Sequence, residues 1–321
     1  MFKKILFATT ASPTCDEAAK VAFDLARRYN AALNVLHVYG IPTRGASPFI
    51  IDVRSGAEET SDDDYAAWVK EEIKITYATQ LRGMEKVQIE CEVGSPATEI
   101  LRKAWKEKAD LIIMGAHTNE EDAGAYRYRT LAGSTMQRVA RGALCPVLIV
   151  SRPCATCFGK SHHIVFGTDL SKPAMAAFKF ACRMARHTGS KLYLFHAVDV
   201  SDTLFGNARV QQDIEQRIAT AQSRMQNLYA TQLDGFDNVV FEVCEGIPHV
   251  EILKFARQKS ASLIVMAHHT HEVDPEKALL GSTVEQVVLR SACPVVSVNR
   301  AERTQPTLPE RDRIGAESVP S

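Results

Sequence analysis

Apolar and polar positions along the chain follow two alternating patterns. Short apolar runs rich in branched residues, such as KILFAT, ALNVLHVY, LIIMGA and PVLIV, are typical of buried parallel strands. Between them, apolar residues recur at the i, i+3, i+4, i+7 spacing of a helix packed on a sheet, as at Ala18, Val21, Ala22 and Leu25. This alternation predicts an α/β fold with a doubly wound parallel sheet and right-handed crossovers.

The whole pattern occurs twice. GSTMQRVARGALCPVLIV (133–150) is echoed by GSTVEQVVLRSACPVVSV (281–298), and KILFATTAS (4–12) by HIVFGTDLS (163–171). The offset between the copies falls from 159 at the first strand to 152 and then to 148. Repeat one therefore has longer connections after its second strand and between Thr118 and Gly133, where loops tolerate length changes. We predict a tandem duplication with five strands in each unit.

The repeated segments also predict the domain boundaries. Repeat one is expected to span residues 1–151 and repeat two residues 162–299, with a short linker at 152–161. Residues 300–321 are polar, charged and proline-bearing, so we expect a disordered tail.

Composition narrows the class of protein. Lys+Arg and Asp+Glu both number 38, so the formal net charge is zero, which argues against a nucleic-acid or membrane-surface protein. No apolar run approaches the length of a membrane span, and the apolar part of MFKKILFATTAS is too short for a signal peptide. The eight cysteines lie mostly within apolar runs, which favours a reducing, cytoplasmic location.

The predicted fold also predicts where a ligand would bind. In an open α/β sheet, ligands bind beyond the carboxyl ends of the strands, where the strand order reverses. There each GST triplet opens a helix, and a glycine followed by free N–H groups and a hydroxyl can cradle a phosphate. An ordinary serine N-cap explains the same triplet. We find no serine elbow, HExxH or Walker A motif in the sequence, so no catalytic set is predicted.

Taken together, these motifs resemble those of the universal stress protein family in its tandem form. The resemblance rests on two five-strand repeats, each with a strand-four end such as IIMGAH, a later GST and a last strand such as CPVLIV, and it covers residues 2–151 and 162–299. It implies a Rossmann-like fold similar to the adenine nucleotide alpha hydrolases. In nucleotide-binding members the pattern is G-x2-G-x9-G-[S/T], with an aspartate ending strand one.

Both repeats depart from that pattern. In repeat one Thr10 replaces the aspartate and Thr118 the second glycine; repeat two keeps Asp169 but has Thr270 at the second glycine position. Binding of ATP or AMP at both sites is therefore not expected, whereas binding at one stays open. The ligand-binding candidates are Thr10, Val38, Gly115, Thr118, Gly133, Ser134 and Thr135 in repeat one, and Asp169, Val198, Thr270, Gly281, Ser282 and Thr283 in repeat two.

The resemblance implies a non-catalytic regulator of a stress response, whose ligand modulates binding to an unknown protein partner. It also implies that PVLIV (146–150) and PVVSV (294–298) pair within one chain as an intrachain pseudo-dimer; further association of two chains stays open. Two alternatives remain. One is an enzyme that hydrolyses or transfers adenylate, and the other is a zinc or redox sensor built on Cys154-x-x-Cys157, although we expect no metal.

Overall fold

The computed structural model describes residues 1–42, 49–52, 56–60, 62–116, 134–153, 163–200, 208–268 and 281–299. Within these ranges, the side chains of residues 41, 42, 134 and 208–210 are outside the description. Several predicted features therefore lie outside the described residues: Thr118, Gly133, Thr270, the Cys154-x-x-Cys157 motif and the tail from residue 300 onward.

Repeat one alternates strands and helices as its apolar pattern predicts. Its strands are β1 (Lys4–Thr9), β2 (Ala32–Pro42), β3 (Phe49–Asp52), β4 (Glu58–Thr60), β5 (Val87–Val93), β6 (Leu111–Gly115) and β7 (Val147–Val150). Its helices are η1 (Pro13–Cys15), α1 (Asp16–Tyr29), α2 (Asp63–Thr76), α3 (Ala78–Leu81), α4 (Pro96–Glu107) and α6 (Ser134–Gly142).

Repeat two follows the same order. Its strands are β8 (His163–Gly167), β9 (Lys191–Val198), β10 (Val239–Glu245), β11 (Leu263–Ala267) and β12 (Val295–Val298). Its helices are α7 (Ala174–Thr188), α8 (Ala208–Tyr229), η2 (Ala230–Gln232), α9 (Pro248–Gln258) and α10 (Ser282–Arg290). Pro96 and Pro248 are the first residues of α4 and α9, where the missing proline N–H leaves no helical bond unmade.

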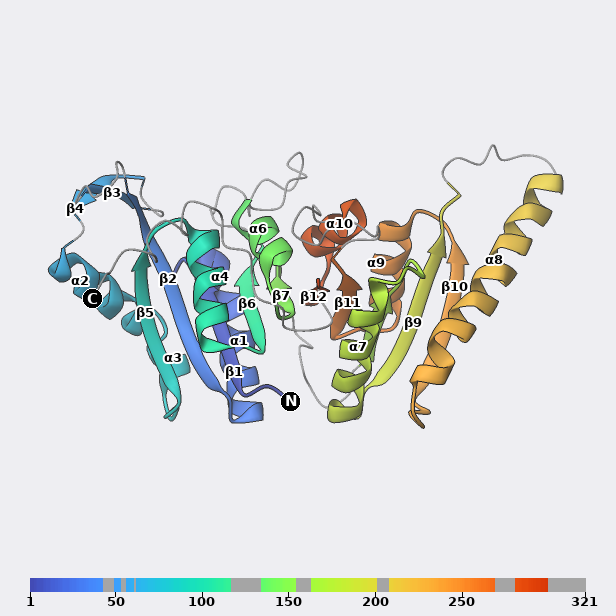
Figure 1. The fold of residues 1–321 in the computed structure, drawn as a ribbon, viewed down its shortest axis with the longest axis horizontal. Helices are drawn as coiled ribbons and strands as arrows, with labels where there is room; N and C mark the ends of the chain where they lie inside the picture. The colour runs from blue at the N-terminus through green and yellow to red at the C-terminus, as the bar shows by residue number, and fades with distance from the viewer. Residues whose placement is uncertain are drawn as a thin grey trace, which may run out of the picture.

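The strands form one 12-stranded sheet with the order β10-β9-β8-β11-β12-β7-β6-β1-β2-β3-β4, in which β5 also pairs with β2 (Figure 1). Within each repeat, five strands are parallel, in the orders β5-β2-β1-β6-β7 and β10-β9-β8-β11-β12. The strand order reverses beside the first strand of each repeat. The predicted fold class, two doubly wound five-stranded units in tandem, is confirmed.

The two repeats join through their last strands. β7 and β12 pair antiparallel, with Leu148 opposite Val296. These two residues are 148 positions apart, which is the offset of the duplication here, so equivalent residues pair with each other. A pseudo-twofold axis therefore passes through this pair, and the predicted pairing within one chain is confirmed. It covers two strand edges that would otherwise be open to other chains.

Helices cover both faces of the sheet, and each buried layer runs through both repeats. Residues of α1, α2, α7 and α8 pack on one face, and residues of α4, α6, α9 and α10 on the other. Contacts also cross the seam on the first face, where the rings of Phe2 and Phe180 lie 6.4 Å apart. The repeats thus share their cores through β7 and β12.

One feature of repeat one was not predicted. The extra length after its second strand contains β3 and β4, which extend the sheet antiparallel beyond the end of β2. The Tyr65 hydroxyl of α2 donates to the Asp52 carboxylate at 2.9 Å and ties the helix to β3. Sequence patterning missed these strands because they are only four and three residues long.

Candidate functional site

The turn after the first strand is held by a buried hydrogen-bond unit. Thr9 Oγ1 lies 2.6 Å from Tyr77 Oη and accepts the N–H of Ala11 at 2.9 Å. His37 Nδ1, at the matching position of β2, lies 2.8 Å from the Thr9 carbonyl oxygen. These contacts hold Ala11 in the left-handed region, with φ of 54°, which non-glycine residues rarely adopt. The turn is therefore fixed by its own hydrogen bond and by contacts from two other parts of repeat one, β2 and the segment after α2.

Repeat two contains the same unit with the same geometry. Thr168 Oγ1 lies 2.6 Å from Tyr229 Oη and accepts the N–H of Leu170 at 3.0 Å, and His196 Nδ1 lies 2.8 Å from the Thr168 carbonyl oxygen. Leu170 has φ of 61°. Burial raises the pKa of Tyr229 to about 12 and lowers the pKa of His196. Both side chains are therefore uncharged at neutral pH.

The sequence contains a signal for this unit that is not among the motifs described above. The tyrosine opens an identical YATQL segment in each repeat, at Tyr77–Leu81 and Tyr229–Leu233. Each segment lies in the sequence between a helix and the third parallel strand. Its sequence neighbours therefore do not indicate that its tyrosine contacts the end of the first strand. The contact joins residues 68 positions apart in repeat one and 61 in repeat two.

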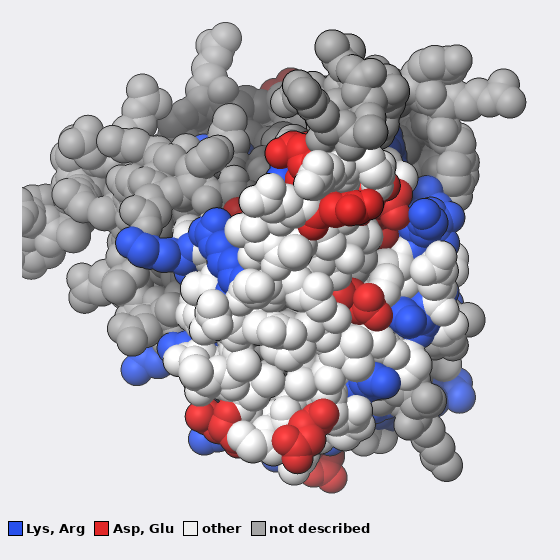
Figure 2. Space-filling model, turned by 90° about the vertical axis from the view of Figure 1, so that its right-hand side faces the viewer, with Lys and Arg blue, Asp and Glu red and all other residues white. Residues whose placement is uncertain are grey.

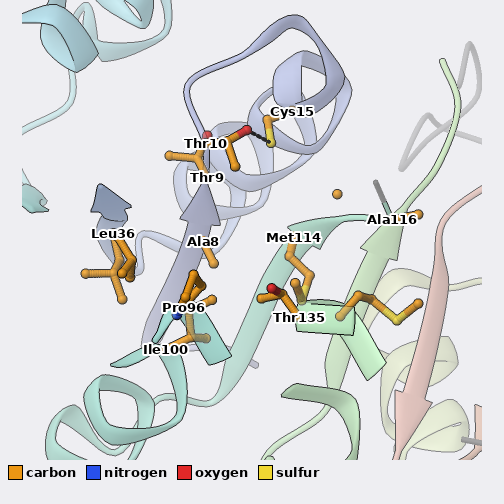
Figure 3. Close-up of a pocket in the computed structure, with 13 residues that line it drawn as sticks. Ala8, Thr9, Thr10, Cys15, Leu36, Pro96, Ile100, Met114, Ala116 and Thr135 are labelled. Carbon is orange, nitrogen blue, oxygen red and sulfur yellow. Dashed lines mark hydrogen bonds between the residues drawn. The ribbon is translucent and has the colours of Figure 1, made fainter. Parts of the chain in front are cut away.

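A cavity of about 70 Å³ lies at the carboxyl ends of the repeat-one strands (Figure 3). One water needs roughly 10–15 Å³, so the cavity has room for a group larger than a single water. It lies where the strand order reverses between β1 and β6, as expected for a ligand site in this fold. The lining residues come from β1, β2, β6 and the starts of three helices: Ala8, Thr9, Thr10, Cys15, Leu36, Val38, Pro96, Ile100, Met114, Gly115, Ala116, Thr135 and Met136.

The structure brings together four of the predicted repeat-one residues. Thr10, Val38, Gly115 and Thr135 all line this cavity, although they come from four different elements or their ends. The Thr10 hydroxyl hydrogen-bonds to Ser12 Oγ at 2.7 Å and lies 3.3 Å from Cys15 Sγ, the contact drawn in Figure 3. Ser134 is the first residue of α6, and its side chain is among those not described.

The described repeat-two candidates, which leave out Thr270, lie around the equivalent strand ends. Asp169 is exposed, and its Oδ1 accepts the N–H of Ser171 at 3.1 Å. Gly281 precedes α10 and donates its N–H to the His268 carbonyl oxygen at 3.1 Å. Ser282 is exposed and Thr283 is half-buried, so both flank the start of that helix.

The strand register places Val198 one position beyond the equivalent of Val38. Ala8 pairs with Leu36 in repeat one and Gly167 pairs with Phe195 in repeat two, so two residues later Val38 corresponds to Ala197. Val198 is buried, and its carbonyl oxygen accepts the N–H of Gly246 at 3.0 Å.

The described lining of the repeat-one cavity is largely uncharged. Its polar groups are the hydroxyls of Thr9, Thr10 and Thr135 and the thiol of Cys15, and its remaining walls are apolar apart from backbone. Among the 13 described residues that line it, none is a carboxylate, histidine, lysine or arginine. General acid–base catalysis needs a titratable group within hydrogen-bond reach of the substrate, and these walls offer only the thiol. A neutral, partly apolar group fits this lining best.

Other kinds of site are less well supported in the part of the chain that the structure describes. There, no group of three or more His, Cys, Asp or Glu side chains could hold a metal ion. The six described cysteines form no disulfide, and burial raises the pKa of Cys91, Cys182, Cys244 and Cys293 to about 11. No described helix is long and apolar enough to cross a membrane.

The described part of the face at the β10 end of the molecule carries charged side chains of both signs. Figure 2 shows acidic and basic side chains interspersed around a central field that carries few charges. Most exposed residues of the second half of α8 are uncharged: Ala219, Thr220, Gln222, Ser223, Gln226 and Asn227. A nucleic-acid surface would instead gather Lys and Arg on one side.

Comparison with known proteins identifies the family. The model of the universal stress protein family matches residues 1–151 and again residues 160–299. The chain belongs to the universal stress protein family. Its two matches agree with the duplication and with the two five-stranded units.

Curated relatives correspond to one repeat each. Universal stress protein MJ0531 of Methanocaldococcus jannaschii is 34% identical over 155 residues, which are 48% of this chain and 84% of that protein. A universal stress protein of Thermus aquaticus is 35% identical over 151 residues, 47% of this chain and 99% of that protein. Each relative is thus similar to about half of this universal stress protein.

Solved structures share the two-unit fold. A universal stress protein from Archaeoglobus fulgidus superposes with a TM-score of 0.61 at 20% identity, covering 92% of this chain and 96% of that chain. The protein PA1789 from Pseudomonas aeruginosa gives a TM-score of 0.59 at 16% identity, covering 94% and 93%. At these identities, the similarity shows the fold alone.

Proposed function

We propose that this universal stress protein is a cytoplasmic, non-catalytic regulator of a stress response that binds an adenine nucleotide and acts through a protein partner. The observation that carries the proposal is the cavity at the switch point of repeat one. Thr10, Val38, Gly115 and Thr135, which the family pattern places around a nucleotide, line it together. Its neutral, partly apolar walls suit an adenine ring or a ribose edge.

The phosphates would lie toward the start of α6. Its first residues, Ser134 and Thr135, follow Gly133, and the free N–H groups of a helix start attract anions. Thr135 also lines the cavity, so a ligand that fills the cavity reaches the helix start. Both repeats still depart from the family pattern, because Thr10 replaces the strand-one aspartate and Thr270 the second glycine.

The proposal is tested by extraction and by binding. The protein is purified without added nucleotide and denatured, and the supernatant is analysed by mass spectrometry for ATP and AMP. Stripped protein is then titrated with AMP and ATP by calorimetry and followed by thermal unfolding. At a nucleotide concentration 100 times the Kd, linkage predicts a stabilisation of about 2.7 kcal/mol. No co-purified nucleotide together with no heat and no thermal shift would overturn the proposal.

A turnover assay separates regulation from catalysis. ATP incubated with the protein is expected to remain intact, because the described cavity offers no carboxylate or histidine to move a proton. Sustained release of phosphate or pyrophosphate that disappears in Thr135→Val would favour the adenylate-hydrolysing alternative. Thr283→Val, at the equivalent position of repeat two, is the matched control.

A further inference from the structure

The strand register shows which repeat-two residues correspond to the strand residues that line the repeat-one cavity. Ala8 pairs with Leu36 on one side and Met114 on the other, and Gly167 pairs with Phe195 and Met266 in the same way. Ala8 therefore corresponds to Gly167, and Leu36 to Phe195. The N–H of Ala116 donates to Val150, as that of His268 donates to Val298, so these two residues also correspond.

At Gly167, the equivalent of Ala8, repeat two lacks a Cβ, and another side chain takes the space that this atom would occupy. A Cβ added at Gly167 would lie 2.3 Å from Ile252 Cδ1, a separation that real Cβ atoms do not show. In repeat one Ala8 carries that Cβ, and Ile100, the equivalent of Ile252, lines the cavity beside it. The Ile252 side chain thus occupies the space beside Gly167 that the Ala8 methyl group would take at the equivalent position.

At two other positions, repeat two has a ring where repeat one has a small or aliphatic side chain. Phe195, in place of Leu36, stacks on Phe255 of α9 with ring centroids 4.6 Å apart. His268, in place of Ala116, is fully buried, with Nδ1 3.5 Å from Ser297 Oγ. The equivalents of Val38 and Met136 are smaller, Ala197 and Val284, and they belong to the same buried cluster as Phe195 and Ile252.

We infer that this chain binds one ligand, in repeat one, and that repeat two fills the corresponding space with its own side chains. Repeat two is then the half of the pseudo-dimer that binds no ligand. The ligand is of a class that is uncharged where it enters the cavity, as an adenine ring is. The inferred stoichiometry rests on the proposed function only for the identity of that ligand; the difference between the two sites stands on packing alone.

The first test needs no ligand. Cys15 lines the repeat-one cavity, and the equivalent position in repeat two is Ala174. The native protein and a Cys15→Ala/Ala174→Cys variant are treated with the small uncharged reagent methyl methanethiosulfonate, and modification at each position is followed by peptide mass spectrometry. Cys15 is expected to react faster by about tenfold or more, because a thiol in a filled site reacts only after local opening. Equal rates would overturn the inference.

The second test exchanges the wall residues. Leu36→Phe/Ala116→His gives repeat one the rings of repeat two, and Leu36→Ile is its control. The double variant is expected to weaken AMP binding by about a hundredfold or more, since the added rings take up volume in the cavity that the ligand would otherwise fill. Phe195→Leu/His268→Ala is the reciprocal variant and is expected to raise the AMP stoichiometry above one per chain. Thermal unfolding identifies any variant that fails to fold.

The outcomes separate this inference from the proposed function. Two equivalents of AMP bound by the native chain would overturn the inference and leave nucleotide binding intact. No AMP bound, together with fast labelling of Cys15 and slow labelling at position 174, would overturn the proposed ligand and leave the inferred difference between the sites intact.

Discussion

Gln137 and Glu285 meet across the pseudo-twofold axis, with Gln137 Nε2 donating to Glu285 Oε1 at 2.9 Å. The two residues are 148 positions apart and occupy equivalent places in α6 and α10. In a dimer of identical units, the same residue would face its own copy, giving either two amides or two carboxylates. Duplication within one chain allows the two positions to differ, and here they form a charge-assisted hydrogen bond.

We predict that Gln137→Glu lowers the free energy of unfolding by about 1–2 kcal/mol at pH 7, because two carboxylates replace a hydrogen-bonded pair. The measurement is urea unfolding at low salt. The exchange variant Gln137→Glu/Glu285→Gln is the control and is expected to recover most of the loss. The loss is also expected to fade as pH falls toward about 4, where glutamates become protonated. An unchanged midpoint for the single variant would mean that the contact contributes nothing.

The buried tyrosine of each repeat is expected to stabilise the protein. Tyr229→Phe removes the hydrogen bond to Thr168 and should lower the free energy of unfolding by about 1 kcal/mol at pH 7. Tyr77→Phe should act in the same direction, because Tyr77 Oη has the same contact with Thr9. The control is Tyr193→Phe, because Tyr193 is a buried tyrosine of β9, and this change is expected to lower the free energy of unfolding by less. Equal stability of Tyr229→Phe and the native protein would contradict the prediction.

Alkaline pH gives the Tyr229 prediction a second readout. Burial raises the pKa of Tyr229 from its ordinary value of 10 to about 12 in the folded protein. Below pH 10 both folded and unfolded states keep the proton, so its stabilising effect is complete. Between pH 10 and about 12 only the unfolded state ionises, so stability is lost as pH rises. Tyr229→Phe should therefore show a shallower loss of stability than Tyr193→Phe across that range in urea titrations.

The seam between the repeats is expected to be sensitive to cavity formation. Leu148 is 1% exposed and lies opposite Val296 on the pseudo-twofold axis. Leu148→Ala should lower the free energy of unfolding by about 2–5 kcal/mol, the usual cost of this change in a core. Val250→Ala is the control, because Val250 is 42% exposed and its loss should cost little. Denaturant unfolding checks both, and comparable midpoints would place the seam outside the stabilising core.

Restoring the family aspartate should strengthen nucleotide binding in repeat one. Thr10→Asp is expected to raise AMP affinity by about tenfold, since a hydrogen bond to a charged group contributes roughly 1.5–3 kcal/mol. Calorimetric titration with AMP is the measurement. Asp169→Thr, the reverse change in repeat two, should leave the affinity of repeat one unchanged. Weaker binding in Thr10→Asp at an unaltered thermal midpoint would show that the ribose does not lie against this position.

Most of the fold could be predicted because its signals are local or repeated. Branched apolar runs and helical spacing mark most of the ten parallel strands and most of the helices, and the doubled GST…CPV segment shows the duplication. The β3–β4 hairpin could not be predicted in this way. Its strands are too short for a periodicity, and Ile50 and Asp52 are buried only because β2 extends beyond the other strands to meet them.

The candidate site was predicted in part. The switch-point rule and the family pattern led to Thr10, Val38, Gly115 and Thr135, which the structure places around one cavity. Neither indicated Cys15 or Met114 as further walls. The contact of Tyr77 with Thr9 was also missed, because it joins two segments that carry no shared local pattern.

The sequence by itself thus determined the duplication and the number of parallel strands, since both follow from repeated segments and from periodic apolar side chains, and the family resemblance added the strand pairing at the seam. Only the tertiary structure decided that a cavity lies among the strand ends of repeat one, while Ile252 reaches the strand in repeat two. Both sites have an isoleucine at that point of the helix, and their difference depends on one methyl group at Ala8 and on the way distant side chains pack around it. Packing at that scale depends on separations of an ångström between segments far apart in the chain, which no local pattern encodes.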